Sequence, residues 1–202
     1  MRLQLLVLSS TPTESAGVDL GSGALRRVVW LEPPAAVFDP YDVVEAHVLP
    51  SDDVPFPNDT LSAVDPVRLG VLRGRRARKL VKPLVHPSSQ PLLGAATPTV
   101  TYWTLRPEAP SVALVAPAAG PVVERDDQLH LRCRFRWRRL DHDLPLDDPV
   151  LDDRLSHPTA TRLAGGTLAR ALGWKPVQLL VSLDPPVEGR CQKVVAGLLP
   201  RP

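Results

Sequence analysis

Three consecutive residues in the second half of the chain have side chains of the types that form metal sites or acid–base sites. Asp141 and Asp143 flank His142, and further aspartates follow as far as Asp153. Carboxylates beside an imidazole can hold a divalent metal ion or orient the imidazole as a general base. The spacing differs from an EF-hand calcium loop, which needs a glycine at its turn and a closing glutamate. Two interpretations remain: a hydrolase-type or metal site at these three residues, or an acidic surface loop that leads into a helix cap.

A row of arginines directly precedes this acidic segment. Residues 129–138 alternate apolar and polar side chains, in the order LHLRCRFRWR, which predicts a strand with one apolar and one cationic face. The cationic face would carry Arg132, Arg134, Arg136 and Arg138, and the apolar face Leu129, Leu131, Cys133, Phe135 and Trp137. Guanidinium groups suit phosphate, but they also pair with carboxylates of neighbouring strands or stay solvated. The sequence leaves these three outcomes open, although the aromatic rings lie on the wrong face to stack with nucleic-acid bases.

A second basic cluster lies earlier in the chain, where the sequence reads RGRRARK. Its cations are Arg73, Arg75, Arg76, Arg78 and Lys79. Such runs are common in segments that bind nucleic acid, and also in hairpin tips that meet an acidic protein. Pro83 and Pro87 follow closely and exclude a long helix, so the cluster is predicted to form either a cationic strand or a single helical turn.

The charges of the chain are segregated although their sum is small. The formal net charge is +2. Residues 28–67 contain no lysine or arginine, residues 68–82 contain no acidic residue, and residues 141–153 are acidic again. Opposite blocks usually pair within a fold or between subunits. This pattern favours a non-catalytic binding or assembly module that uses segregated acidic and basic surfaces, with a protein partner or a second copy of the chain. Nucleic acid is the alternative partner.

The composition indicates a mainly β protein. The chain has 202 residues, of which 44% are hydrophobic, enough for one good core. Its 24 prolines are spread along the chain, and proline is excluded from helix interiors and central strands. We attribute the preference for arginine over lysine to the codon usage of a GC-rich bacterial genome.

Periodicity and turn residues predict the individual elements. Strands are expected over residues 2–8, 25–31, 41–49, 67–72, 99–105, 111–116, 121–124, 129–138, 177–183 and 190–199. Residues 41–49 also suit a short helix, and residues 111–139 should form consecutive antiparallel strands. Loops are expected over residues 9–23 and, rich in proline, near residues 50–66 and 86–98. One short helix should start at Asp148, and another should cover residues 167–172 and end at Gly173.

These elements predict an antiparallel barrel or sandwich with one or two short helices near residues 148–173, in a single globular domain over residues 1–202. An α+β arrangement is the alternative. Because no specific catalytic or ligand motif is present, we expect no cofactor and favour a non-catalytic protein over an enzyme. No segment approaches the roughly 20 apolar residues of a membrane helix, so we expect no membrane partner and a cytoplasmic location. Cys133 and Cys191 are expected to be two buried thiols, with a disulfide as the alternative.

Overall fold

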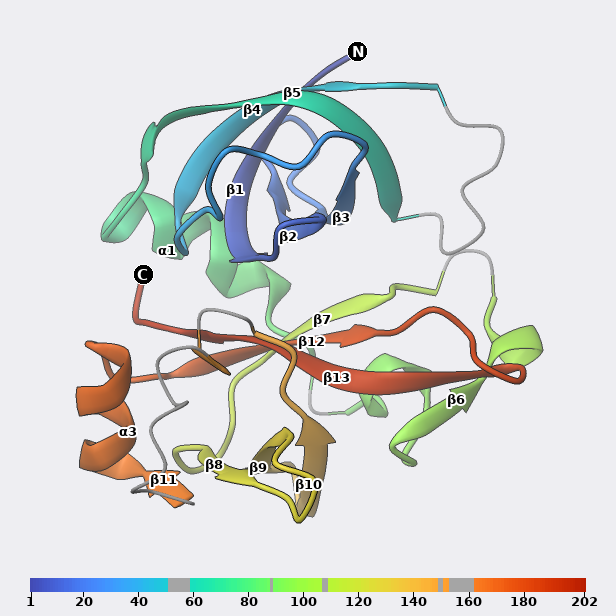
Figure 1. The fold of residues 1–202 in the computed structure, drawn as a ribbon, viewed down its shortest axis with the longest axis vertical. Coiled ribbons are helices and arrows are strands. Elements are labelled where there is room, and N and C mark those ends of the chain that lie inside the picture. The colour runs from blue at the N-terminus through green and yellow to red at the C-terminus, as the bar shows by residue number, and fades with distance from the viewer. Residues whose placement is uncertain (51–58, 88, 107–108, 149–150, 153–161) are drawn as a thin grey trace.

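The computed structural model describes residues 1–50, 59–87, 89–106, 109–148, 151–152 and 162–202. The molecule is mainly β with short helices, as composition and periodicity predict. Figure 1 shows two lobes: a five-stranded barrel from the first part of the chain, and below it two four-stranded sheets with flanking helices.

The first lobe is a closed barrel. Its strands are β1 (Arg2–Ser10), β2 (Glu14–Asp19), β3 (Leu25–Trp30), β4 (Asp42–Val48) and β5 (Thr60–Val71). They follow one another around the barrel in the order β1, β2, β3, β5, β4, and β4 pairs with β1 to close it. The fourth strand therefore lies beside the first, which is the strand order of a Greek key. The β3–β5 pair is parallel, whereas the other pairs of the barrel are antiparallel.

β2 occupies part of residues 9–23, which the polar and glycine-rich sequence predicts as a loop. That prediction is wrong because small side chains suit the crowded contact between β1 and β2. A Cβ atom at Gly17 would overlap the backbone carbonyl of Leu6 on β1. Ser15 accepts a hydrogen bond of 3.0 Å from the indole nitrogen of the buried Trp30, so its hydroxyl is satisfied inside the barrel.

The second lobe contains two sheets. Its strands are β6 (Thr99–Thr101), β7 (Val112–Val115), β8 (Val122–Arg125), β9 (Leu131–Trp137), β10 (Leu140–Pro145), β11 (Arg162–Ala164), β12 (Gln178–Leu183) and β13 (Arg190–Leu199). One sheet has the order β10, β9, β8, β11, and the other β6, β13, β12, β7. The predicted closing pair of strands is confirmed, because β12 and β13 are antiparallel neighbours.

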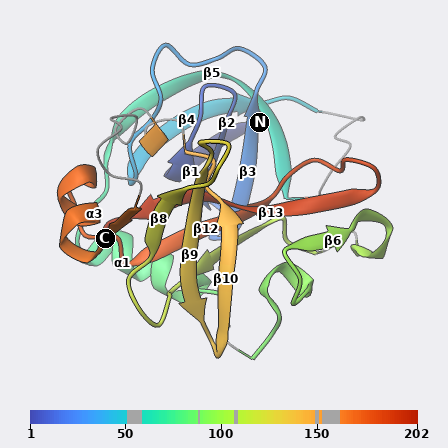
Figure 2. The ribbon, with the colours of Figure 1, turned by 60° about the horizontal axis from the view of Figure 1, so that its bottom comes forward.

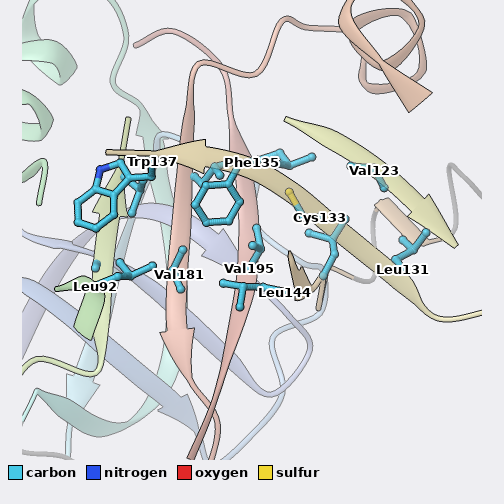
Figure 3. Packing of buried hydrophobic residues seen from close by; sticks show 14 of the residues in the cluster. Leu92, Val123, Leu131, Cys133, Phe135, Trp137, Leu144, Val181 and Val195 are labelled. Carbon is cyan, nitrogen blue, oxygen red and sulfur yellow. The ribbon is translucent and has the colours of Figure 1, made fainter. Parts of the chain in front are cut away.

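The core of the second lobe lies between these two sheets (Figure 3). Cys133, Phe135 and Trp137 project from β9 toward Val181 of β12 and Val195 of β13. The buried thiols of Cys133 and Cys191 belong to this core and are both free. The apolar half of the alternating sequence is therefore the part that β9 contributes to the core.

A separate cluster of apolar side chains joins the two lobes. Leu6 and Leu8 of β1 project out of the barrel and pack with Leu114 of β7 and Leu180 of β12. β7 is apolar on both faces for this reason. Val112 and Leu114 face the barrel, whereas its other two residues belong to the core between the sheets. The expectation that β7 pairs with β8 is thus wrong: β7 pairs with β12, and of the three strands within residues 111–139 only β8 and β9 are antiparallel neighbours.

β5 begins earlier than expected, since residues 60–66 belong to it and not to a proline-rich loop. The proline is tolerated because the register between β4 and β5 shifts there, and Asp65 has a positive φ of 53°. Such a bulge leaves a backbone amide unpaired, which removes the usual objection to proline in a strand. The remainder of that predicted loop, residues 51–58, lies outside the described residues.

Residues 99–105 form a shorter strand than expected. β6 ends at Thr101, and a 3₁₀ helix, η3 (Tyr102–Thr104), follows. The amide of Tyr102 donates to the carbonyl of Gly189, and the ring of Trp103 covers that glycine. The chain therefore turns around the β12–β13 hairpin instead of continuing along β13.

Leu129 lies outside the strand predicted over residues 129–138. It has a φ of 65° in the β8–β9 turn, and its side chain is 70% exposed. The turn is held by Asp126, whose carboxylate accepts hydrogen bonds from the amides of Gln128 and His130. Leu129 fits the apolar alternation of the sequence, but in this turn its side chain does not reach the core.

The basic cluster forms a helix of two turns, α1 (Arg75–Val81), where we expected a strand or a single turn. Ala77 and Val81 are buried against both lobes, and this apolar pair at i and i+4 stabilises the helix. Two 3₁₀ helices follow, η1 (Lys82–Leu84) and η2 (Leu92–Gly94), the second inside the loop expected over residues 86–98.

The helix expected over residues 167–172 is confirmed as α3 (Gly165–Leu172), and Gly173 ends it with a left-handed φ of 80°. At the other expected helix start, Asp148 accepts a hydrogen bond of 3.0 Å from the amide of Leu151, as a cap should. Most of that predicted helix, which should end before Pro158, lies outside the described residues, namely residues 149–150 and 153–157. Among the helices that the structure describes, none is long and apolar enough to cross a membrane.

Candidate interaction surface

β9 presents its arginines on one face, as predicted, and carboxylates of both neighbouring strands meet them (Figure 2 shows β8, β9 and β10 side by side). Asp143 of β10 lies directly opposite Arg134 and accepts from both Arg132, at 2.8 Å, and Arg134, at 3.2 Å. Glu124 of β8 binds Arg134 from the other side at 2.9 Å. Two of the four arginines therefore have their partners within the sheet.

The other two arginines are held more loosely. Arg136 approaches the exposed Asp141 only at 4.0 Å. Arg138 lies in the β9–β10 turn, where it donates to the carbonyl of Ser89 at 3.3 Å and sits 5.6 Å from the ring centre of Trp137. Of the three outcomes that the sequence leaves open, pairing with carboxylates of neighbouring strands therefore applies to Arg132 and Arg134.

Strand geometry separates the three residues of the predicted metal or hydrolase-type site. Because side chains alternate along β10, Asp141 and Asp143 lie on the arginine face, whereas His142 lies on the core face. The His142 ring stacks on Phe135, with ring centres 5.1 Å apart. Within the described residues no three His, Cys, Asp or Glu side chains are placed to hold a metal ion. The structure therefore does not bring Asp141, His142 and Asp143 together as one site.

A buried cation near His142 escaped the sequence analysis. Lys193 of β13 has 0% exposure, and its Nζ donates to the carbonyl of Ala95 at 2.6 Å. Burial lowers the pKa of Lys193 to about 8. Burial also lowers the pKa of His142, and the charge of Lys193 adds to that effect while Asp141 opposes it. Because the amine is fully enclosed, it cannot contact a substrate in this conformation.

A group of carboxylates lies where the two lobes meet. Arg27 of β3 is buried there, binds Glu14 at 2.7 Å and donates to the carbonyl of Leu183 at 2.6 Å. Asp184 directly follows Leu183. Its pKa is raised to about 6, mainly by burial and further by the charges of Asp147 and Glu14, while the charge of Arg27 lowers it. The guanidinium of Arg27 therefore links β2 of the barrel to the second lobe. We interpret the carboxylates around it as part of this structural contact.

The cations around α1 differ from those of β9. Arg75, Arg76, Arg78 and Lys79 project away from the buried side of the helix, and Arg73 precedes it. Within the described part of the chain, no ion pair joins any of these five side chains to a carboxylate. The first turn of α1 also lacks an acidic residue, so the positive end of the helix adds to their charge.

The strand that leads into α1 exposes aliphatic side chains. Val67 is 57% exposed, Leu69 53% and Val71 43%. β3 pairs with β5 only as far as Ala63, so beyond that residue β5 has β4 as its sole strand neighbour among the described residues. Figure 1 shows β5 arching over the outside of the barrel before the chain enters α1.

We call this region the β5–α1 surface. It comprises Val67, Leu69, Val71, Arg73, Arg75, Arg76, Arg78 and Lys79. The sequence analysis identified its cations but not its apolar part, because it predicted a strand over residues 67–72 without predicting which of its side chains are exposed. The signals that could have revealed the exposure are Pro66 and Gly70, two residue types that are unusual in a central strand.

A cavity of about 550 Å³ lies beside this surface, where four separate segments of the chain converge. Its walls include Tyr41 before β4, Arg73 before α1, Trp174 after α3 and Arg201 after β13. The Tyr41 hydroxyl donates to the carbonyl of Pro200 at 2.7 Å, and the Trp174 indole donates to that of Leu198 at 3.2 Å. Both rings are thereby fixed in the wall of the cavity.

Comparison with known proteins adds no family to these observations. No protein-family model matches the chain, and no curated protein matches it.

Proposed function

We propose that the protein is a non-catalytic binding module and that the β5–α1 surface docks an acidic protein partner. The observation that carries this proposal is the contrast in pairing: the central arginines of β9 have carboxylate partners, whereas the α1 cations have none among the described residues. Unpaired charge of one sign beside exposed aliphatic side chains is the composition of a protein-docking surface.

A protein partner fits this surface better than nucleic acid does. Val67, Leu69 and Val71 offer aliphatic contacts but no aromatic ring on which a base would stack. Two of the β9 arginines that would have contributed to a nucleic-acid interface, Arg132 and Arg134, are engaged by Asp143 and Glu124. The proposal therefore favours carboxylates as the groups that meet α1.

The outer face of β2 and β3 gives a second argument against nucleic acid. Five-stranded Greek-key barrels of the OB type bind oligonucleotides on that face. Here Ala16 and Val18 of β2 pack with β7 and β12, and Arg27 of β3 is bound to Glu14. The second lobe thus covers the face that such barrels use.

A second copy of the chain is a less suitable partner for the same surface. In a two-fold symmetric dimer the same patch meets itself, so two sets of α1 cations would come close together. Like charges within the Debye length of about 8 Å repel one another at physiological salt. A partner with acidic and apolar residues has no such conflict. The two free, buried cysteines accord with a reducing compartment such as the cytoplasm, which we include in the proposal.

The experiment that tests this proposal compares two anionic probes of equal formal charge. One is a labelled peptide that alternates glutamate and valine, and the other is labelled single-stranded DNA, with an RNA of the same length beside it. Fluorescence anisotropy over a salt series should give tighter binding to the peptide. Tighter binding to DNA or RNA at every salt concentration would replace the protein partner by nucleic acid, and binding to none of the probes would overturn the proposal.

A charge-reversal variant tests whether α1 is the part of the protein that binds the acidic peptide. The triple variant Arg75→Glu, Arg78→Glu, Lys79→Glu should weaken peptide binding by about tenfold or more, since three exposed charge pairs of up to about 1 kcal/mol each are lost and 1.4 kcal/mol is tenfold in affinity. The control is Arg170→Glu, which reverses one exposed charge on α3 and changes the net charge by two units where the triple variant changes it by six. A loss of binding free energy in the control of one third or more of that in the triple variant would show a non-specific effect of net charge.

A further inference from the structure

We propose that the acidic protein partner contributes an extended segment that adds a strand to the open edge of β5. This inference rests on the proposed function, because it names the form in which the partner binds the β5–α1 surface. The backbone of that segment would pair with residues 67–71. Its apolar side chains would lie beside Val67, Leu69 and Val71, and its carboxylates would lie near α1.

Beyond Ala63, β5 has one paired edge and one open edge. On one side β5 pairs with β4 as far as Val71. On the other side its pairing with β3 ends at Ala63, whose carbonyl accepts a hydrogen bond of 3.0 Å from the amide of Leu31. In the part of the chain that the structure describes, no loop forms a backbone hydrogen bond with residues 64–71. The amide and carbonyl groups of these residues that point away from β4 are therefore available to another strand.

The same part of β5 is open to solvent. Val67, Arg68 and Leu69 are three consecutive exposed residues. Because successive side chains of a strand point to opposite faces, neither face of β5 is covered there. A Cβ atom at Gly70 would have no described atom within 4 Å apart from those of its chain neighbours. An incoming strand can therefore reach this part of the edge.

Two irregularities define the length of the open edge. Pro66 has no amide hydrogen and follows Asp65, whose φ is 53°, so strand addition is unfavourable on the N-terminal side of Pro66. The register with β4 shifts again at Leu69, which increases the local twist but removes no amide. Residues 67–71 remain, and this segment has the length of a typical strand, about 5 residues.

The side chains around the edge indicate the chemistry of the partner. Val67, Leu69 and Val71 lie on one face of β5, and side chains of an added strand would lie about 4.5–5.5 Å from them. The α1 cations follow β5 directly in the chain, so carboxylates at that end of the added strand would meet them. A helix could contact the same side chains but would leave the open backbone edge unpaired. The partner segment is therefore extended, with alternating aliphatic residues and carboxylates.

Two N-methylated forms of the peptide that alternates glutamate and valine test this assignment. In an extended strand the amides of alternate residues point to the same side, so methylation of the valine nitrogens blocks one edge of the peptide and methylation of the glutamate nitrogens blocks the other. Fluorescence anisotropy should show that only one form binds about tenfold or more weakly than the parent peptide, because the hydrogen bonds lost along one edge contribute on that scale. The other form should keep the affinity of the parent.

Equal affinities of the two methylated forms would overturn the inference. Both forms would bind like the parent if the peptide docked through its side chains alone, and both would bind weakly if the peptide docked as a helix. The proposed function would survive either result, since the parent peptide still binds. If the parent peptide does not bind, the proposed function fails and this inference fails with it.

Amide hydrogen exchange measures the same contact from the side of the protein. Amides of residues 67–71 that point away from β4 should exchange rapidly in the free protein, and saturation with the parent peptide should slow them by about tenfold or more. The control is β10, which also forms the edge of a sheet but bears acidic side chains, so its exchange rates should stay unchanged. Unchanged rates in β5, or equal slowing in β10, would overturn the inference. Slow β5 exchange in a free protein that sediments as a dimer would assign the edge to a second copy of the chain and would also overturn it.

Discussion

β9 and α1 each present a row of cations on one side of a short element, but their surroundings differ. The β9 row lies in the middle of a sheet, and strands on both sides supply carboxylates, at 2.8 Å for Arg132 and 2.9 Å for Arg134. α1 lies at the edge of the barrel, and no described carboxylate forms an ion pair with its cations. Arginine content alone therefore does not identify a binding surface. What distinguishes the two regions is whether the fold itself supplies the counter-charge.

The comparison also explains where apolar side chains lie in each region. β9 turns its apolar residues into the core and leaves its arginines outside, where Arg132 and Arg134 are paired with carboxylates. β5 and α1 leave both cations and aliphatic side chains exposed. Charges that are paired within the fold stabilise the folded protein. Unpaired charges and exposed apolar groups can instead form favourable contacts with a binding partner.

Lys193 gives the largest expected effect, since it is a cation shielded from solvent that forms no ion pair with a carboxylate among the described residues. Its pKa of about 8 lies below the unfolded value of 10.5, so the unfolded chain binds more protons between these values. Stability should therefore rise with pH through this window, by about 1–3 kcal/mol from this group. Urea unfolding at pH 7 and pH 10 should show that increment in the wild type but not in Lys193→Met, whereas Lys175→Met should retain it. A Lys193→Met protein with an undiminished pH increment would mean that this amine does not titrate in the folded state as described.

Asp143→Ala tests the pairing of β9 and should lower the free energy of unfolding by about 1–2 kcal/mol. The substitution removes the carboxylate shared by Arg132 and Arg134, and the exposure of these side chains limits the effect. Asp141→Ala is the matched control, because that residue is more exposed and reaches Arg136 only at 4.0 Å. Chemical denaturation should separate the two variants. Equal stability would show that the β9 row is solvated and not paired.

Arg75→Glu gives the smallest expected effect on stability, a gain of about 0.3–1 kcal/mol. Position 75 lies in the first turn of α1, which has no acidic residue, and a negative charge there complements the helix dipole. The thermal midpoint should rise slightly or stay unchanged, whereas peptide binding should weaken. A clear loss of stability would indicate that Arg75 has a partner within the protein, which would remove it from the free surface.

Much of the fold could be predicted from the sequence because it depends on local patterns. The alternation of residues 131–137, the closing pair of strands and the αL cap at Gly173 are set by period-two patterning and by glycine geometry. β2 could not be predicted in this way, since its small residues are explained only by the closeness of β1. The same holds for β7, whose two apolar faces need two different lobes.

The candidate site was predictable only in part. Basic residues at positions 73–79 stand out in the sequence, but whether they are paired depends on strands that are distant in the chain. Residues 132–138 look equally suitable for an anion until Asp143 and Glu124 are placed beside them. Arg201 and Trp174 have no local signal at all, since only the convergence of the segments that enclose the cavity makes them neighbours of Arg73.

The most direct test of this account neutralises three cations in each region and measures binding and stability together. One variant replaces Arg75, Arg78 and Lys79 by glutamine, and the other replaces Arg132, Arg134 and Arg136 by glutamine. The α1 variant should lose binding of the acidic peptide and keep its urea midpoint, whereas the β9 variant should keep the binding and lose stability. If the β9 variant loses peptide binding while the α1 variant retains it, the surface that docks the partner is the arginine face of β9 and the account is contradicted.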